Sequence, residues 1–195
     1  MERFLTAKHW QIFMLTFGLP FMIEIIAMPF MIFGNNPMMV VKIMPLIMIL
    51  FLAGYFGWFW AIAVNLQRIL PDDLKLSTAK FKIFMLLPVI YILIFFVFLD
   101  SAINGSFENE SSTFPAMFAL IFPLHLFSMF CIFYCLYFVA KVFKTAELVR
   151  KVTFSDFAGE FFLIWFFPIG IWVIQPKINK MIESKGVTNL NEETE

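Results

Sequence analysis

Residues 11–33 read QIFMLTFGLPFMIEIIAMPFMIF, and this stretch decides the class of the protein. It is apolar almost throughout and holds one ionisable side chain, Glu24, close to its middle. As a helix it is about 35 Å long, enough to cross the apolar core of a bilayer, which is about 30 Å thick. Because a carboxylate at that depth is costly in lipid, we expect Glu24 to face protein or trapped water.

The composition of the whole chain agrees with a membrane protein. Of its 195 residues 62% are hydrophobic and 14% charged, whereas soluble domains are about half apolar and about a quarter charged. The formal net charge is zero, from 14 basic and 14 acidic residues, so no overall field favours nucleic acid as a partner. No polar stretch is long enough for a separate soluble domain of ordinary size, so the lipid bilayer is the expected surrounding.

Four long apolar stretches predict an all-α integral membrane protein with four transmembrane helices. The spans are expected at residues 11–33, 38–65, 81–99 and 113–140. A tight turn is expected at residues 34–37, GNNP, because Gly, Asn and Pro each favour turn conformations. Together the spans form a four-helix transmembrane bundle over residues 1–152.

Basic side chains alternate along the segments that flank these spans. Lys and Arg are present in residues 1–10, 67–80 and 141–151, and they are absent from residues 34–37 and 100–112. Because cytoplasmic loops carry an excess of Lys and Arg, both termini are expected on the cytoplasmic side of the cell membrane. The four spans then form two tandem hairpins.

A fifth apolar stretch, residues 157–175, is interrupted by Pro168 and Gly170. Its uncharged part is short for a span, and a full crossing would place the lysines that follow it outside, against the charge rule. The pattern therefore favours a re-entrant or interfacial, membrane-dipping segment within residues 153–182 over a fifth span. Residues 183–195 are polar and acidic, and we expect a disordered tail there.

Part of this C-terminal region resembles a known group of proteins. Residues 153–180 read TFSDFAGEFFLIWFFPIGIWVIQPKINK. This block resembles one in small multi-pass membrane proteins of bacteria to which no activity is assigned. The resemblance implies a location in the bacterial inner membrane and says nothing about chemistry.

Three side chains make up a candidate intramembrane polar site: Glu24, His125 and Lys42. Glu24 has several interpretations. It pairs with Lys42 of the neighbouring span, faces His125 and water as a proton or cation site, is protonated and bonded to backbone or hydroxyl groups, or meets a partner chain. Glu24 follows Lys8 by as many residues as His125 precedes Lys141, so both groups are expected at the same depth.

Signatures of enzymes and cofactor sites are missing from the sequence. There is no H-E-x-x-H, G-x-S-x-G, Walker or G-x-G-x-x-G motif, and the only histidines are His9 and His125. Cys131 and Cys135 lie four apart in an apolar run and are expected to be small buried helix side chains. We therefore expect no catalytic residues, no metal and no cofactor.

Prolines lie inside every apolar stretch and predict local breaks in the helices. They are Pro20, Pro29, Pro45, Pro88, Pro123 and Pro168. Each can kink a helix and free a carbonyl oxygen, although prolines are also common in membrane helices without such a role.

The leading functional hypothesis is a non-enzymatic subunit of a membrane complex that acts through helix–helix contacts. Its partner would be a second copy of the chain or another membrane protein. The alternative is a small transporter or channel subunit that uses the mid-membrane groups Glu24 and His125.

Overall fold

The computed structural model describes residues 3–33, 38–103 and 113–192 of the chain, and these residues form helices and turns without a strand. In chain order the elements are α1 (Arg3–Thr6), α2 (His9–Phe13), η1 (Met14–Gly18), α3 (Leu19–Phe33), α4 (Met38–Trp60), η2 (Ala61–Asn65), η3 (Leu66–Ile69), η4 (Asp72–Leu74), α5 (Ala79–Ile103), α6 (Thr113–Leu148), α7 (Phe154–Trp165) and α8 (Phe167–Glu192). The elements η1 and η2 are π-helices, and η3 and η4 are 3-10 helices.

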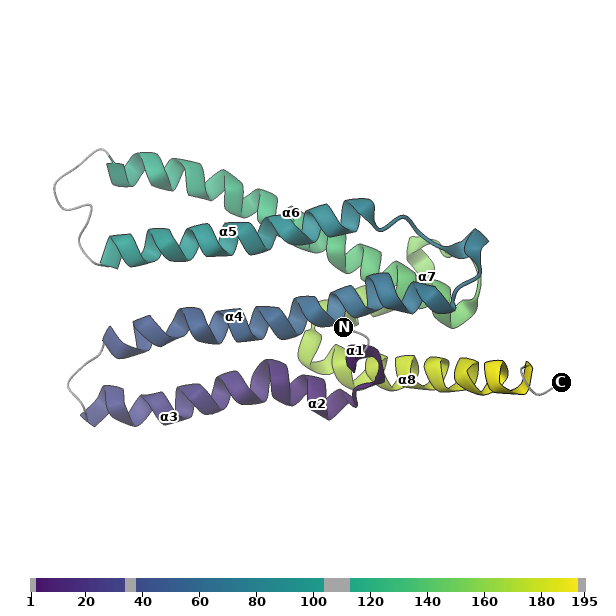
Figure 1. Cartoon of the computed structure of the whole chain (residues 1–195). Helices are drawn as coiled ribbons and strands as arrows, with labels where there is room; N and C mark the ends of the chain where they lie inside the picture. The colour runs from purple at the N-terminus through teal and green to yellow at the C-terminus, as the bar shows by residue number, and fades with distance from the viewer. Residues whose placement is uncertain (1–2, 34–37, 104–112, 193–195) are drawn as a thin grey trace. The chain divides into compact units, whose positions relative to one another are not determined.

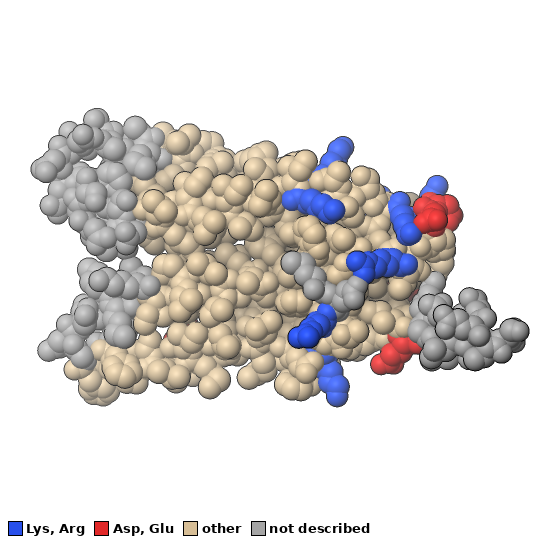
Figure 2. Space-filling model, viewed as in Figure 1, with Lys and Arg blue, Asp and Glu red and all other residues tan. Residues whose placement is uncertain are grey.

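Among the described residues, four helices are long and apolar enough to cross a membrane. They are His9–Phe30, Ile43–Ile69, Ala79–Leu99 and Ala119–Leu148. The prediction of an all-helical protein with four candidate spans is thereby confirmed. Most of the surface visible in Figure 2 carries neither basic nor acidic side chains. The predicted turn at 34–37 and most of the predicted loop at 100–112 lie outside the described residues.

The chain divides into two compact units. Unit 1 comprises Met1–Leu76 and Phe138–Glu195, and unit 2 comprises Ser77–Tyr137. These units group residues whose Cα atoms lie close together, whereas the predicted division into residues 1–152 and 153–182 follows membrane crossings and stays a prediction.

Unit 1 is built on the packing of its N-terminal helices against both α4 and α8. In Figure 1, α3 lies beside α4, and η1 also contacts α4. The short helices α1 and α2 pack against α8, and α7 folds back on α8. Its largest fully buried side chains include Ile12, Trp58, Phe59, Phe143, Phe157, Ile164 and Ile174. Each such side chain makes many close van der Waals contacts, which together stabilise the packing of unit 1.

An aromatic cluster joins the start of α8 to η1 and α4. The ring of Phe167 lies 4.7 Å from Tyr55, 5.3 Å from Trp58 and 5.6 Å from Phe17, measured between ring centroids. The contact with Phe51 is longer, at 6.4 Å. Aromatic pairs in this range add about 0.5–1.5 kcal/mol each beyond burial, so the cluster fixes where α8 begins.

The π-helix η1 has a cause in the sequence, because it ends two residues before Pro20. Proline donates no hydrogen bond, and its ring clashes with the carbonyl four residues earlier, which here belongs to Thr16. The wider π-turn, in which Leu19 N–H donates to Met14 O, relieves that clash. Thr16 is fully buried, and its hydroxyl has no hydrogen-bond partner in the described structure. A Cβ at Gly54 would collide with that hydroxyl, so Gly54 allows η1 and α4 to approach closely.

The other predicted proline breaks are milder. Pro29, Pro45, Pro88 and Pro123 lie inside α3, α4, α5 and α6, and none of them ends its helix. Pro168 is the second residue of α8, where a missing N–H costs nothing, so it begins a helix instead of interrupting one.

The helices α7 and α8 meet in a tight turn at Phe166. The N–H of Phe166 donates to Phe162 O, and the N–H of Gly170 donates to Phe166 O, both at 2.9 Å. A Cβ at Gly170 would overlap the backbone carbonyl of Leu163, so this position requires glycine. In contrast, a Cβ at Gly159 on α7 would meet nothing within 4 Å.

The described part of α8 extends beyond residue 183, where the sequence predicts the start of a polar tail; the disorder predicted for residues 183–195 stays a prediction. The helix continues to Glu192. The segment contains residues with good helix propensity, such as Glu183 and Lys185, and it extends a helix that is already formed, so no new nucleation is needed.

Unit 2 consists of α5 and the N-terminal part of α6. Rings join the two helices: Phe84 lies 4.8 Å from Tyr134, and Tyr91 lies 5.5 Å from His125, between centroids. Cys131 and Cys135 are free and buried in α6, which confirms the prediction for both thiols.

Candidate functional site

Glu24 lies on α3 within the first candidate span, and its side chain is exposed. It makes no hydrogen bond and no ion pair with any residue that the structure describes. Its neighbours one turn away on the helix, Phe21 and Met28, are 61% and 52% exposed. Any enclosure of this carboxylate must therefore come from outside the described part of unit 1.

Lys42 lies on α4, the helix beside α3, and its side chain is outside the part of the chain that the structure describes. The register of the two helices follows from the close approach of Thr16 to Gly54. Counted along antiparallel helices from this pair, residue 42 lies opposite Met28, about one helical turn from Glu24. The pairing of Lys42 with Glu24 stays a prediction.

His125 lies on α6 in unit 2, and Tyr91 of α5 holds its ring. The Tyr91 hydroxyl and the His125 Nδ1 atom are 2.9 Å apart. His125 is exposed, whereas Tyr91 is 8% exposed. Because Glu24 belongs to unit 1, the meeting of Glu24 with His125 stays a hypothesis. The partner that the structure gives His125 is a tyrosine.

A second polar feature, absent from the sequence-based prediction, is centred on Gln175 of α8. The buried indole Nε1–H of Trp58 donates to Gln175 Oε1 at 2.7 Å. The Gln175 Nε2 group faces the carbonyl oxygens of Phe4, Leu5 and Ala7 at 3.0, 3.1 and 3.0 Å. One fully buried amide thus joins α4, α8 and the C-terminal end of α1.

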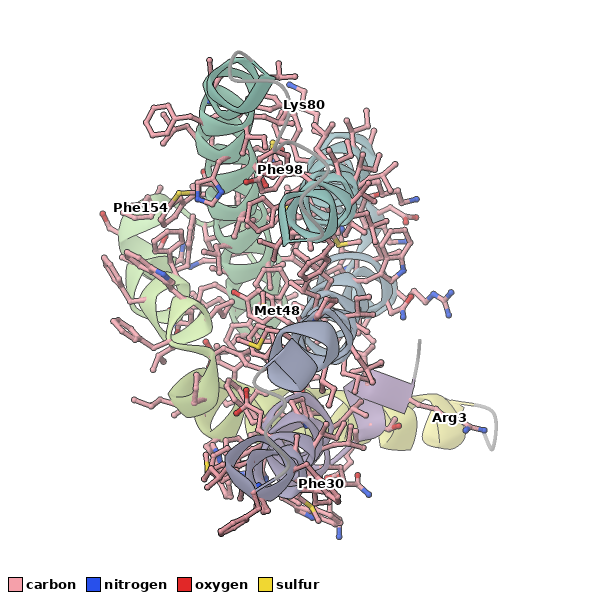
Figure 3. The ribbon with its side chains drawn as sticks, turned by 90° about the vertical axis from the view of Figure 1, so that its left-hand side faces the viewer. Arg3, Phe30, Met48, Lys80, Phe98 and Phe154 are labelled. Atoms are coloured by element: carbon pink, nitrogen blue, oxygen red, sulfur yellow. The ribbon has the colours of Figure 1, made fainter. Side chains whose placement is uncertain are left out.

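Asn179, one turn further along α8, completes this arrangement. Its Oδ1 accepts from Gln175 Nε2 at 3.0 Å, and its Nδ2 donates to Ala7 O at 3.2 Å. We call the set of Gln175, Trp58, Asn179 and the bonded carbonyls the Gln175 hub. Figure 3 shows α1, with Arg3, alongside α8. The last carbonyls of a helix lack backbone donors, and here side-chain amides supply them.

No family model, curated protein or solved structure matches the chain. The resemblance of residues 153–180 to bacterial membrane proteins therefore stays an expectation.

A partly buried ion network joins α6, α7 and α8. Lys144 contacts Glu147 at 2.7 Å and Glu160 at 2.8 Å, and Lys177 contacts Glu147 at 2.8 Å. The Lys177 ammonium also lies 5.9 Å from the centre of the Phe143 ring. Because partly buried pairs are screened less than exposed ones, this network helps to fix the three helices relative to one another.

A capping arrangement begins α7. The Asp156 carboxylate accepts hydrogen bonds from the Arg150 guanidinium at 2.7 Å and from the Thr153 backbone N–H at 2.8 Å. These bonds, first that of Arg150 and then those of Thr153, hold the pKa of the Asp156 carboxyl well below its usual range.

Signals for some of these missed residues are present in the sequence. Tyr91 is the only tyrosine in the predicted span 81–99, and Gln175 is the only amide in the apolar stretch 157–175. A lone polar group in an apolar helix needs a partner, so both residues were candidates. Which residues partner them depends on packing between distant segments.

Proposed function

We propose that the protein is a non-enzymatic, multi-pass membrane protein that works as a subunit of a membrane complex through helix–helix contacts. The observation that supports this proposal is Glu24, an exposed carboxylate within a candidate span, without a partner among the described residues. A charged side chain at the centre of a lipid-facing helix costs about 2.5–3.5 kcal/mol on insertion scales. A partner helix that offers Glu24 a hydrogen bond or a positive charge removes that cost.

The surface around Glu24 suits such a helix. Phe21, Ile25 and Met28 surround the carboxylate on α3 with large apolar side chains, each more than half exposed. Packing and interhelical hydrogen bonds, not the hydrophobic effect, drive association of helices within lipid. The apolar side chains supply packing area, and the single carboxylate selects a helix with a matching donor.

The proposed topology is two tandem hairpins with both termini in the cytoplasm of a bacterial cell. It is supported by the four candidate spans and by the distribution of Lys and Arg. Single-cysteine labelling with an impermeant reagent tests it, in a background that lacks Cys131 and Cys135. Ser106→Cys is expected to react in intact cells and Lys75→Cys is not.

We further propose that α7 and the start of α8 form a re-entrant or interfacial segment. Neither helix is among the candidate spans of the described chain, and the chain turns back at Phe166. Trp165 and Trp172 are 47% and 50% exposed, as expected for rings at a membrane interface. Labelling of a cysteine at Asn191 from outside the cell would instead mean that this segment crosses the membrane.

The subunit proposal is tested with Glu24→Gln in the full-length protein, extracted from its native membrane in mild detergent. The mass of the native assembly and the thermal stability of the purified chain are measured together. We expect the variant to lose the larger assembly while the chain keeps its stability. Glu183→Gln, a change at an exposed carboxylate outside the candidate spans, should leave the assembly intact.

Two results would contradict this proposal. One is an assembly of unchanged mass in Glu24→Gln. The other is a destabilised isolated chain whose stability Lys42→Met restores, because that recovery would show Glu24 and Lys42 paired within one hairpin.

A second candidate function is transport, with Glu24 and His125 as mid-membrane groups on a proton or cation path. It is favoured by their expected equal depth and by the exposed His125 ring. Glu24→Gln and His125→Gln should then each abolish a proton- or cation-coupled flux in liposomes without loss of stability. A flux that neither variant changes would remove this alternative.

A further inference from the structure

We propose that unit 2 holds an intramembrane binding site for an apolar, carbonyl-bearing molecule, built on the hydrogen-bonded pair Tyr91 and His125. The site would bind the carbonyl through the His125 ring and an apolar part of the ligand in the adjoining cavity. It lies in unit 2 alone and is independent of the role proposed for Glu24.

The first step concerns the direction of the Tyr91–His125 hydrogen bond. Tyr91 is 8% exposed, and His125 is the only hydrogen-bond partner of its hydroxyl among the described residues. A buried O–H that donates to nothing is costly, so the hydroxyl donates to His125 Nδ1. The neutral ring then carries its own proton on Nε2.

The second step follows from the surroundings of that Nε2–H group. His125 is exposed within the candidate span Ala119–Leu148, and Nε2 has no partner among the described residues. In the interior of a bilayer there is no water to accept its hydrogen bond. The group is therefore a fixed donor, held in orientation by Tyr91, that needs an acceptor carried by a lipid-soluble molecule.

The third step is the cavity next to the pair. Tyr91 lines a cavity of about 70 Å³ whose other walls are apolar side chains of α5 and α6, together with Ser128. Ser128 is 4% exposed, and no hydrogen bond joins its hydroxyl to another described residue. Leu124, another lining residue, directly precedes His125 in the chain. Ligand pockets commonly combine apolar walls with a few such polar groups.

These features specify the chemistry of the ligand. A donor without charge favours a neutral acceptor, and a carbonyl oxygen is the acceptor that apolar molecules most readily carry. The small cavity accepts a methyl-bearing edge or a chain end, not a whole ring system. Two sources supply this chemistry: the ester carbonyl of a bilayer lipid and the carbonyl of a free lipid-soluble compound such as a quinone.

Nitrogen-15 NMR of the histidine side chains tests the proposal, because His9 and His125 are the only histidines and His9 serves as an internal control. The full chain is placed in nanodiscs of diether phospholipid, which has no carbonyl, and a short-chain benzoquinone is added. Nanodiscs of diester phospholipid form the second arm. We expect His125 to carry its proton on Nε2, and its Nε2–H resonance to move in one arm while His9 does not respond.

The two arms and two variants separate the outcomes. A response to the quinone identifies a free ligand, and a response to diester lipid alone identifies the bilayer lipid. Tyr91→Phe should leave the His125 ring free to adopt either tautomer. It should also weaken binding of the carbonyl roughly tenfold, which corresponds to a loss of about 1.4 kcal/mol. Ser128→Val, which fills part of the cavity, should weaken the response but keep the Nε2–H tautomer, and the retained tautomer shows that unit 2 is folded.

The proposal is wrong if the His125 resonance responds in neither arm. It is also wrong if the wild-type ring carries its proton on Nδ1, because Tyr91 would then not aim a donor at the ligand.

Discussion

Replacement of Gln175 by methionine is the sharpest test of what holds unit 1 together. Methionine has a similar length and shape but makes no strong hydrogen bond, so the change removes the polar contacts and keeps the packing. The buried Trp58 Nε1–H then loses its acceptor at 2.7 Å, a cost of about 1–3 kcal/mol for an unsatisfied donor. The Nε2 group has two hydrogens, so at most two of its facing oxygens lose a bond at one time, each worth about 0.5–1.5 kcal/mol.

Added together, these terms predict that Gln175→Met lowers the free energy of unfolding by about 2–6 kcal/mol. The remaining bond from Asn179 Nδ2 to Ala7 O, at 3.2 Å, favours the lower half of that range. The assay is denaturant unfolding of the purified full-length protein in detergent micelles, followed by tryptophan emission. Glu183→Gln, at an exposed position on the same helix, serves as the control and should change the stability by less than about 0.5 kcal/mol.

A double-mutant cycle with Trp58→Phe isolates the central bond. When the indole N–H is absent, Gln175→Met no longer strands a buried donor, so the two changes should be less than additive by about 1–3 kcal/mol. Two results would show that Gln175 does not hold the N-terminal segment in place. One is that the two changes have additive effects, and the other is that the stability of Gln175→Met lies within about 0.5 kcal/mol of wild type.

Three further predictions concern close contacts and a cap. Gly170→Ala should prevent the α7–α8 turn and lower the yield of folded protein, because the added Cβ meets a backbone carbonyl that cannot move aside. The control Gly159→Ala should leave the thermal stability unchanged or raise it slightly. Gly54→Ala should lower the thermal stability. Thr16→Ala in the same chain should recover most of the loss, because the colliding hydroxyl is then removed. If no stability is recovered, η1 and α4 do not meet at this pair. The pKa of Asp156 is lowered in the folded state, so the contribution of this carboxylate to stability is complete above about pH 4 and is lost as the pH falls toward its folded-state pKa. Asp156→Asn should remove this dependence when unfolding is measured across the acidic pH range.

The all-helical fold with four candidate spans could be predicted because it depends on local properties of the chain. Length and composition alone predict a span at the apolar stretch around Glu24 and at three others, and the structure contains four candidate spans among its described residues. Burial of Cys131 and Cys135 followed from their place in an apolar run. The break near Pro168 and Gly170 was also visible, although the turn itself lies at Phe166.

The polar contacts could not be predicted, because they join residues that are distant in sequence. Nothing around Gln175 indicates that its partners are Trp58 and the carbonyls of Phe4, Leu5 and Ala7. Tyr91 and His125 are 34 positions apart, and nothing in the sequence between them indicates their bond. The π-helix at Thr16 is an intermediate case. Pro20 predicts irregular helical hydrogen bonding one turn earlier, but whether the helix kinks there or widens into a π-turn depends on how closely Gly54 approaches.

The bond from Gln175 to the carbonyl of Phe4 spans 171 residues, and this separation bears on how the protein is made. Because a ribosome makes the chain in order, the residues of α1 and α4 are synthesised long before those of α8. Throughout that interval the indole of Trp58 and the end of α1 lack the amide that joins them. A chain whose translation stops before codon 175 therefore cannot form the hydrogen bonds that hold Phe4, Leu5 and Ala7 to α8.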